Sequence, residues 1–162
     1  MDDVAAMARL IDALRPWSES VVIVGGWAHR LHRLHPDATL PTYQPIVTLD
    51  ADLALQQDAQ LAGNIGEALK ASGFNEELSS EHVPPITRYS LGDDQEDGAF
   101  HAEFLTPLRG SGLHRSGRDD ATVATGGITA QKLRNLEVLL VAPWVLGLEP
   151  HGPFPVQQQT NV

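Results

Sequence analysis

The chain of 162 residues is 42% hydrophobic and 20% charged, which is ordinary for a single globular domain long enough to bury a core. Its 11 Lys and Arg against 21 Asp and Glu give a formal net charge of −10, which argues against broad electrostatic binding of nucleic acid. It contains no cysteine, which excludes disulfides, thiolate zinc sites and cysteine nucleophiles.

The sequence lacks the features that direct a chain to a membrane. Met1 is followed by Asp2 and Asp3, which have the wrong charge for the start of a signal peptide. The longest mostly apolar stretch, 136–148, is too short for a membrane span and contains Glu137 and Pro143. We therefore predict a soluble, cytoplasmic protein that does not enter a membrane.

The N-terminal region predicts a helix, a buried strand and a second helix. Asp2 or Asp3 caps a first helix that ends near Leu14, before Arg15-Pro16. The β-branched run 20–24 predicts a buried strand, and 27–35 predicts a second helix. The inward positions of the two helices are Val4, Met7, Leu10, Ile11, Leu14, Ala28, Leu31 and Leu34.

Gly25-Gly26 joins the strand to the second helix, and the unit has the composition of an anion site. Glycine lets phosphate oxygens approach the main chain, and a helix N-terminus offers free N–H groups and a favourable dipole. The alternative is a tight strand-to-helix connection that needs glycine only for its backbone angles.

The second helix also carries three histidines and two arginines. His29 and Arg33 are four positions apart and His32 and His35 are three apart, so each pair shares a face. The simplest interpretation is a solvated basic face, and the alternative is a transition metal held by His32 and His35. If this face is functional, Arg30 or Arg33 contacts phosphate.

The segment 46–55 alternates in polarity as a half-buried strand does, and its polar face carries two acids. Asp50 and Asp52 share that face, roughly 7 Å apart along the backbone. Carboxylates this close raise each other's pKa unless a cation lies between them, and Mg²⁺ takes one or two carboxylates plus substrate phosphates. The alternative is an edge strand with a charged solvent face.

One helix and three strands follow this segment. The helix is predicted over 59–72, and the strands over 74–78, 85–91 and 100–108. The acidic segment 92–98 between the last two strands is most simply a solvated hairpin turn, because it lacks the spacing of a calcium loop.

The last of these strands holds a single acid. Glu103 lies between Ala102 and Phe104 and shares its face with His101 and Leu105. A buried Glu103 needs a partner or a cation, and the alternative is an acid on the solvent face of the sheet.

The C-terminal part predicts a helix over 128–141 after Gly126-Gly127, and then a return to the core at 144–146. The inner residues of this helix are Ile128, Leu133, Leu136, Leu139 and Leu140. From Pro150 onward we expect a disordered tail. The expected organisation is one domain over 1–149, with 128–149 as the start of a truncated helical part, and a tail over 150–162.

Taken in order, the glycine pair and the three acids resemble the nucleotidyltransferase superfamily, which has the fold of the DNA polymerase β catalytic domain. The motifs stand here as Val24-Gly25-Gly26, Thr48-Leu49-Asp50-Ala51-Asp52-Leu53 and Ala102-Glu103-Phe104. The combination Gly25-Gly26-Trp27-Ala28-x-x-Leu31-His32 with Asp50-x-Asp52-Leu53 most resembles bacterial nucleotidyltransferase-like proteins related to AbiEii-type toxins. The similarity covers about 18–145.

The resemblance implies an α+β fold, a mixed β-sheet with helices packed mainly on one face. It implies Mg²⁺-dependent transfer of a nucleoside monophosphate from an NTP to a hydroxyl acceptor. Asp50, Asp52 and Glu103 would be the catalytic and metal-binding acids, with Glu103 holding the ion that activates the acceptor. The residues it assigns to the nucleotide are Gly25, Gly26, Trp27 and Arg30.

The resemblance also implies partners. The cofactor is Mg²⁺, with Mn²⁺ as the alternative ion, and the candidate acceptors are tRNA or a protein. An antitoxin or another partner protein fits a toxin-like role.

Two departures from the family pattern matter, and the second, together with the low count of lysines, favours a rival interpretation. The gap between Gly26 and Asp50 is long, and the sequence ends where relatives continue into a helical half with basic residues. The alternative function is a non-catalytic nucleotide-binding or regulatory module of the same fold, completed by a partner.

Overall fold

The computed structural model describes residues 2–45, 47–56, 59–92 and 98–158. It is an α+β fold with a large mixed sheet, as expected from the resemblance. In chain order the elements are α1 (Asp3–Leu14), η1 (Arg15–Trp17), β1 (Val21–Val24), α2 (Gly25–His32), β2 (Asp50–Leu55), α3 (Ile65–Ala71), β3 (Asn75–Ser79), β4 (Ile86–Leu91), β5 (Phe100–Pro107), β6 (Thr122–Thr125), β7 (Ile128–Leu133), η2 (Leu136–Leu140), β8 (Trp144–Gly147) and β9 (Pro153–Val156). Among the described residues, no helix is long and apolar enough to cross a membrane.

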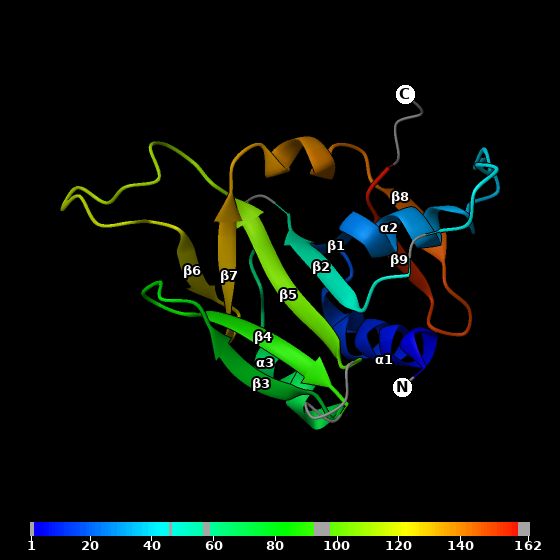
Figure 1. The fold of residues 1–162 in the computed structure, drawn as a ribbon, viewed down its shortest axis with the longest axis horizontal. Helices are drawn as coiled ribbons and strands as arrows, with labels where there is room; N and C mark the ends of the chain where they lie inside the picture. The colour runs from blue at the N-terminus through cyan, green and yellow to red at the C-terminus, as the bar shows by residue number, and fades with distance from the viewer. Residues whose placement is uncertain (1, 46, 57–58, 93–97, 159–162) are drawn as a thin grey trace.

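The nine-stranded sheet follows the order β3-β4-β5-β2-β1-β9-β8, and β7 joins it beside β5 with β6 at its outer edge (Figure 1). β5 is the centre of this arrangement. It runs parallel to β2 on one side, while β4 pairs with its first half and β7 with its second half on the other. The parallel pairing of β2 with β5 sets the positions of the acids.

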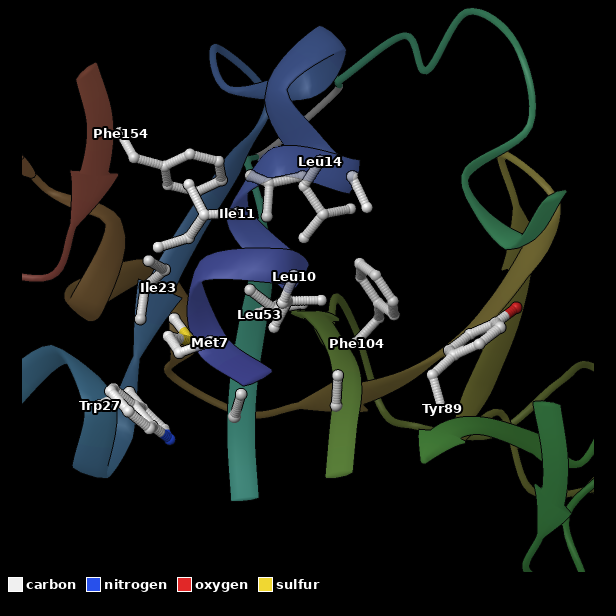
Figure 2. Close-up of a cluster of buried hydrophobic side chains, with 14 of the residues drawn as sticks. Met7, Leu10, Ile11, Leu14, Ile23, Trp27, Leu53, Tyr89, Phe104 and Phe154 are labelled. Atoms are coloured by element: carbon white, nitrogen blue, oxygen red, sulfur yellow. The ribbon is translucent and has the colours of Figure 1, made fainter. Parts of the chain in front are cut away.

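One face of the sheet is covered by α1, α2 and α3, which share one large core cluster with it. The N-cap of α1 is Asp2, whose carboxylate accepts a hydrogen bond from the Val4 amide. Figure 2 shows the apolar side of α1 packed on the sheet and on Phe154 of β9. The labelled side chains there are Met7, Leu10, Ile11, Leu14, Ile23, Trp27, Leu53, Tyr89, Phe104 and Phe154. Val4 and Leu34, both expected to face inward, are exposed.

The opposite face is covered over part of its area by a small second cluster. Val22, Ala54 and Leu105 lie side by side in register on β1, β2 and β5, and Leu136 of η2 packs on them. Two residues before Ala54 and Leu105, the same face carries Asp52 and Glu103 instead of apolar side chains.

The helix predicted over 128–141 is wrong. Residues 128–133 form β7, and the helical part is the short η2. Gly126 and Gly127 both have positive φ and form the two-residue turn of the β6–β7 hairpin, a geometry that glycine pairs favour. The Thr87 hydroxyl also accepts from the Thr129 amide at 2.8 Å, which ties β7 to β4. The spacing of apolar residues in 128–133 is compatible with either a strand or a helix. The segment is a strand because it pairs with β5 and β6.

The disordered tail predicted over 150–162 is also wrong for its first part. β9 lies within it, pairs parallel with β1 through Ile23 and Val156, and forms a hairpin with β8. The edge of β1 would otherwise expose unpaired backbone groups, and β9 satisfies them. Residues 159–162 lie outside the described residues.

The other elements agree in type with the expectations and differ in their bounds. Strands β3, β4 and β5 are confirmed. β2 begins at Asp50, and Ile46 lies outside the described residues. α3 begins at Ile65 instead of position 59, because Asn64 caps it by accepting from the Glu67 amide at 2.9 Å. Of the predicted hairpin turn 92–98, residues 93–97 lie outside the described residues.

The burial of Phe154 gives a direct test of β9. Phe154 is 1% exposed in the main core cluster, so Phe154→Ala should lower the free energy of unfolding by about 3–5 kcal/mol. Urea unfolding measures the loss. The control is Val145→Ala on β8, since Val145 is 60% exposed and should change stability little. Equal stability of the two variants would contradict the packing of β9.

Candidate functional site

A row of register partners crosses four strands of the sheet on its sparsely covered face. Val24 of β1 is opposite Asp52 of β2, Asp52 is opposite Glu103 of β5, and Glu103 is opposite Arg88 of β4. Neighbouring strands lie about 4.8 Å apart, so side chains in such a row are in reach of one another. The sheet therefore places Asp52 and Glu103 side by side on one face.

Asp50 lies one pleat before Asp52, opposite His101 of β5. The two aspartates, Glu103, Arg88 and His101 line a cavity of about 300 Å³, with Ala51 at its base. All three predicted acids therefore lie on one cavity. The structure describes larger hollows as well, but the one of about 540 Å³ beside Asp12 has a single lining acid.

The glycine corner abuts the acid strand directly. A Cβ atom built on Gly25 would lie 2.7 Å from Oδ2 of Asp52, and one on Gly26 would lie 2.7 Å from Cγ2 of Thr48. Gly25 also has a φ of +68°, in the left-handed region where side chains are unfavourable. The glycines thus leave room for the side chains of Asp52 and Thr48, and Gly25 also has a backbone angle that favours glycine.

The first amide of α2 has a partner from the far end of the described chain. Gln157 follows β9, and its side-chain Oε1 accepts a hydrogen bond from the Gly25 amide at 3.3 Å. The backbone amide of Gln157 also donates to the Ile23 carbonyl at 2.8 Å, which holds the residue beside β1. An anion at this corner would compete with the Gln157 carboxamide for the Gly25 amide.

Asp52 is the acid of the site whose negative charge is disfavoured by its surroundings. Burial raises the pKa of the Asp52 carboxyl above its usual range, and the negative charges of Glu103 and Asp50 raise it further. Glu103 differs because it has a cation beside it. Nε of Arg88 donates to Oε1 of Glu103 at 2.6 Å, and this bond raises the pKa of Arg88.

The donors fit a hard divalent ion in their chemistry, because Mg²⁺ prefers carboxylate oxygens. The partial burial of Asp52 among like charges leaves a deficit of positive charge that such an ion would fill. Within the described residues, however, no group of three His, Asp or Glu side chains is arranged to hold a metal. Binding through all three acids therefore requires side chains to move, and Glu103 would have to rearrange its contact with Arg88.

Trp27 and Arg30, expected at the nucleotide, are not brought to this cavity. Trp27 is 2% exposed and packs edge-to-face against Phe100. Figure 2 shows Trp27 among the buried core side chains. Arg30 forms an ion pair with Asp3, lowering the pKa of that carboxyl, and lies 4.6 Å over the Trp27 ring. In this structure α2 turns these side chains toward α1 and the core.

The histidine face of α2 is a packed surface instead of a solvated one. His32 is buried, and both His32 and His35 stack on Trp144 of β8, with ring centroids 4.5 and 3.9 Å apart. Burial lowers the pKa of His32, and His29 and His35 lower it further. Arg33 donates to the backbone carbonyl of Tyr43. Stacking on Trp144 accounts for the packing of His32 and His35.

Sequence reasoning missed Arg88, His101 and Gln157. Arg88 could have been found in the same way as Glu103, because it too is a charged residue on a predicted strand. It lies between Thr87 and Tyr89. His101 was placed on the face of Glu103 but given no role. Gln157 gave no signal, since it lies 132 positions from Gly25.

The close approach of Gly25 to Asp52 predicts an excess loss of stability in Gly25→Ala. A left-handed residue other than glycine costs about 1–2 kcal/mol, and turning the Asp52 carboxylate away from the new Cβ should add about 0.5–1.5 kcal/mol. Urea unfolding measures both. Gly117→Ala is the matched control, because Gly117 has a φ of +78° and open space around its Cβ. In the double variant Gly25→Ala/Asp52→Ala, the loss of stability beyond that of Gly117→Ala should disappear. A persistent extra loss would refute the collision with Asp52.

The raised pKa of Asp52 predicts a pH-dependent gain of stability in Asp52→Asn. A carboxyl with a raised folded-state pKa stabilises the fold below its unfolded pKa, and this contribution is lost as pH rises through the folded pKa. In EDTA at neutral pH, the Tm of Asp52→Asn should therefore exceed that of the wild type by a few degrees. The gain should vanish near about pH 3, below both pKa values.

Thermal unfolding followed by circular dichroism across this pH range measures the difference. Asp37→Asn, an exposed acid after α2, is the control and should show no comparable gain. A loss of stability in Asp52→Asn at neutral pH would contradict the assigned repulsion.

Comparison with protein families agrees with this geometry. A family model described as nucleotidyltransferase matches residues 2–157, which include the glycine corner and all three acids. Neither a comparison with curated proteins nor one with solved structures gives a match. Because the family model covers nearly the whole chain, the protein belongs to the nucleotidyltransferase family.

Proposed function

We propose that this protein is a Mg²⁺-dependent nucleotidyltransferase that moves a nucleoside monophosphate from an NTP to a hydroxyl acceptor. The observation that carries the proposal is the convergence of Asp50, Asp52 and Glu103 on one cavity, directly beside the Gly25-Gly26 corner. Family membership supports a nucleotide substrate and a transfer reaction. Mn²⁺ is the alternative ion.

The reaction joins the acceptor oxygen to the α-phosphorus and breaks the bond to pyrophosphate, which leaves. The acceptor hydroxyl loses its proton to a carboxylate of the site or to solvent. When bound, the divalent ion would neutralise charge on the phosphates and lower the pKa of the acceptor hydroxyl. Positioning and charge neutralisation provide most of the catalysis in such transfers, so few other reactive side chains are needed.

The chain's own residues divide this work. Asp50 and Asp52 would hold the ion on β2, and Glu103 would hold it from β5 on the acceptor side. Gly25 and Gly26 leave the space beside Asp52 and Thr48 in which a phosphate can approach the main chain. The Gly25 amide becomes available to a phosphate oxygen once the Gln157 carboxamide leaves it.

A toxin-like role is the finer part of the proposal. It includes a relation to AbiEii-type toxins, tRNA or a protein as acceptor, and an antitoxin as partner. Its support is the similarity of the segments Gly25–His32 and Asp50–Leu53, and family membership leaves acceptor and partner open.

A non-catalytic nucleotide-binding or regulatory module is the second candidate. It is favoured by the two contacts that already satisfy site groups, Arg88 on Glu103 and Gln157 on Gly25. A partner protein could then complete the nucleotide site.

Asp50→Ala separates the two functions. Incorporation of α-labelled nucleotide from each of the four NTPs is measured with Mg²⁺, using tRNA, protein and the chain itself as acceptors. Asp50→Ala should lower incorporation on the order of 100-fold, because it removes a ligand of the divalent ion that would stabilise charge on the transferred phosphoryl group. Glu137→Ala, which removes an exposed acid of η2, is the control and should retain activity.

The other outcomes are equally specific. Nucleotide binding without transfer, unchanged in Asp50→Ala, would favour the non-catalytic module. Absence of both binding and transfer for all four NTPs would contradict both functions.

A further inference from the structure

Arg88 stands between two acids in the row that crosses the sheet. Its register partners are Glu103 of β5 on one side and Glu77 of β3 on the other. The direct bond is to Glu103, from Nε to Oε1 at 2.6 Å, while the Glu77 carboxylate accepts from the Ser90 hydroxyl. The main partner of Arg88 is therefore Glu103.

Glu103 faces opposite charges on its two sides. Toward β2 it meets the partly buried Asp52, and toward β4 it meets the Arg88 guanidinium. The side chains of Arg88 and Glu103 are 38% and 26% exposed, so the pair is only partly screened by water. Among the described residues lining the cavity, Arg88 is the one that is permanently positive.

A divalent ion at the three acids has to compete with this guanidinium. Both bind the Glu103 carboxylate, and an ion beside Arg88 is repelled by its charge. The same contact agrees with the finding that the acids are not arranged as a metal-ligand set among the described residues. A metal–triphosphate complex should bind here more readily than the bare ion, because the negative phosphates offset the repulsion between the ion and Arg88.

We propose that Arg88 is a built-in competitor for the metal at Glu103, which keeps the affinity for free divalent ions low until a nucleotide arrives with the ion. Arg88 is then a positioning residue that acts through Glu103. This inference rests on the proposed function, because it takes the acidic cavity to be the metal–nucleotide site. It adds an order to the reaction, in which metal and NTP enter together.

Free Mn²⁺ measured by electron paramagnetic resonance, in titrations without nucleotide, tests the proposal. Arg88→Gln removes the charge but retains an N–H donor for Glu103, so Mn²⁺ should bind roughly tenfold more tightly than to the wild type. Arg88→Lys retains the charge and should bind Mn²⁺ as weakly as the wild type. Arg15→Met removes an exposed positive charge at the end of α1 and should have no effect.

A purely structural role for Arg88 gives the opposite sign. Arg88→Gln would then weaken Mn²⁺ binding, because its shorter side chain orients Glu103 less well than the guanidinium does, and this result would overturn the proposal. Arg88→Met, which has no donor, is the second variant if Arg88→Gln does not fold. It should also bind Mn²⁺ more tightly, and weaker binding would count equally against the proposal.

The titration also separates this inference from the proposed function. If Mn²⁺ binds the wild type in a way that Asp52→Asn abolishes, and Arg88→Gln has the same affinity, the competitor role is wrong and the proposed function stands. If Mn²⁺ binds neither the wild type nor the Arg88 variants without nucleotide, the competitor role is wrong, and the incorporation of nucleotide from the four NTPs decides the proposed function separately.

Discussion

The in-register parallel pairing of β2 with β5 is the constraint on which the site depends. It sets Asp52 opposite Glu103 and Asp50 opposite His101, and it gives Asp52 like-charged neighbours that make its ionised form unfavourable. A slip of one residue in this pairing would turn Glu103 toward the helices, because strand side chains alternate between faces. The apolar partners Ala51 and Ala102, or Leu53 and Phe104, hold the register from the core side.

The sheet serves two purposes with its two faces. The helices bury one face in a continuous core, and η2 covers part of the other with a smaller cluster. The acids begin where that smaller cluster ends, at Val24 and Asp52 in the same row. A charged site next to a packed one is compatible with stability here because Arg88 compensates Glu103, Asp50 is exposed and Asp52 is only partly buried.

Local patterns predicted the elements that carry the acids, because polarity alternates clearly in β2 and β5 and the neighbouring glycines mark a corner. The same local patterns failed where distant pairing decides the structure. The segment after Gly126-Gly127 became β7 through its pairing with β5 and β6, and β9 formed because β1 had an open edge. Trp27 was misplaced because a motif gives the position of a residue in the chain but not the direction of its side chain.

The contact between Gln157 and Gly25 joins the corner to the last strand of the sheet. Ile23 of β1 pairs with Val156 of β9, and the next residue along reaches over the start of α2. Any oxyanion that takes the Gly25 amide releases that carboxamide and removes one of the tethers of the β8–β9 hairpin. Gly25 and Gln157 lie 132 positions apart in the chain, so this one hydrogen bond links the corner directly to the segment that closes the sheet.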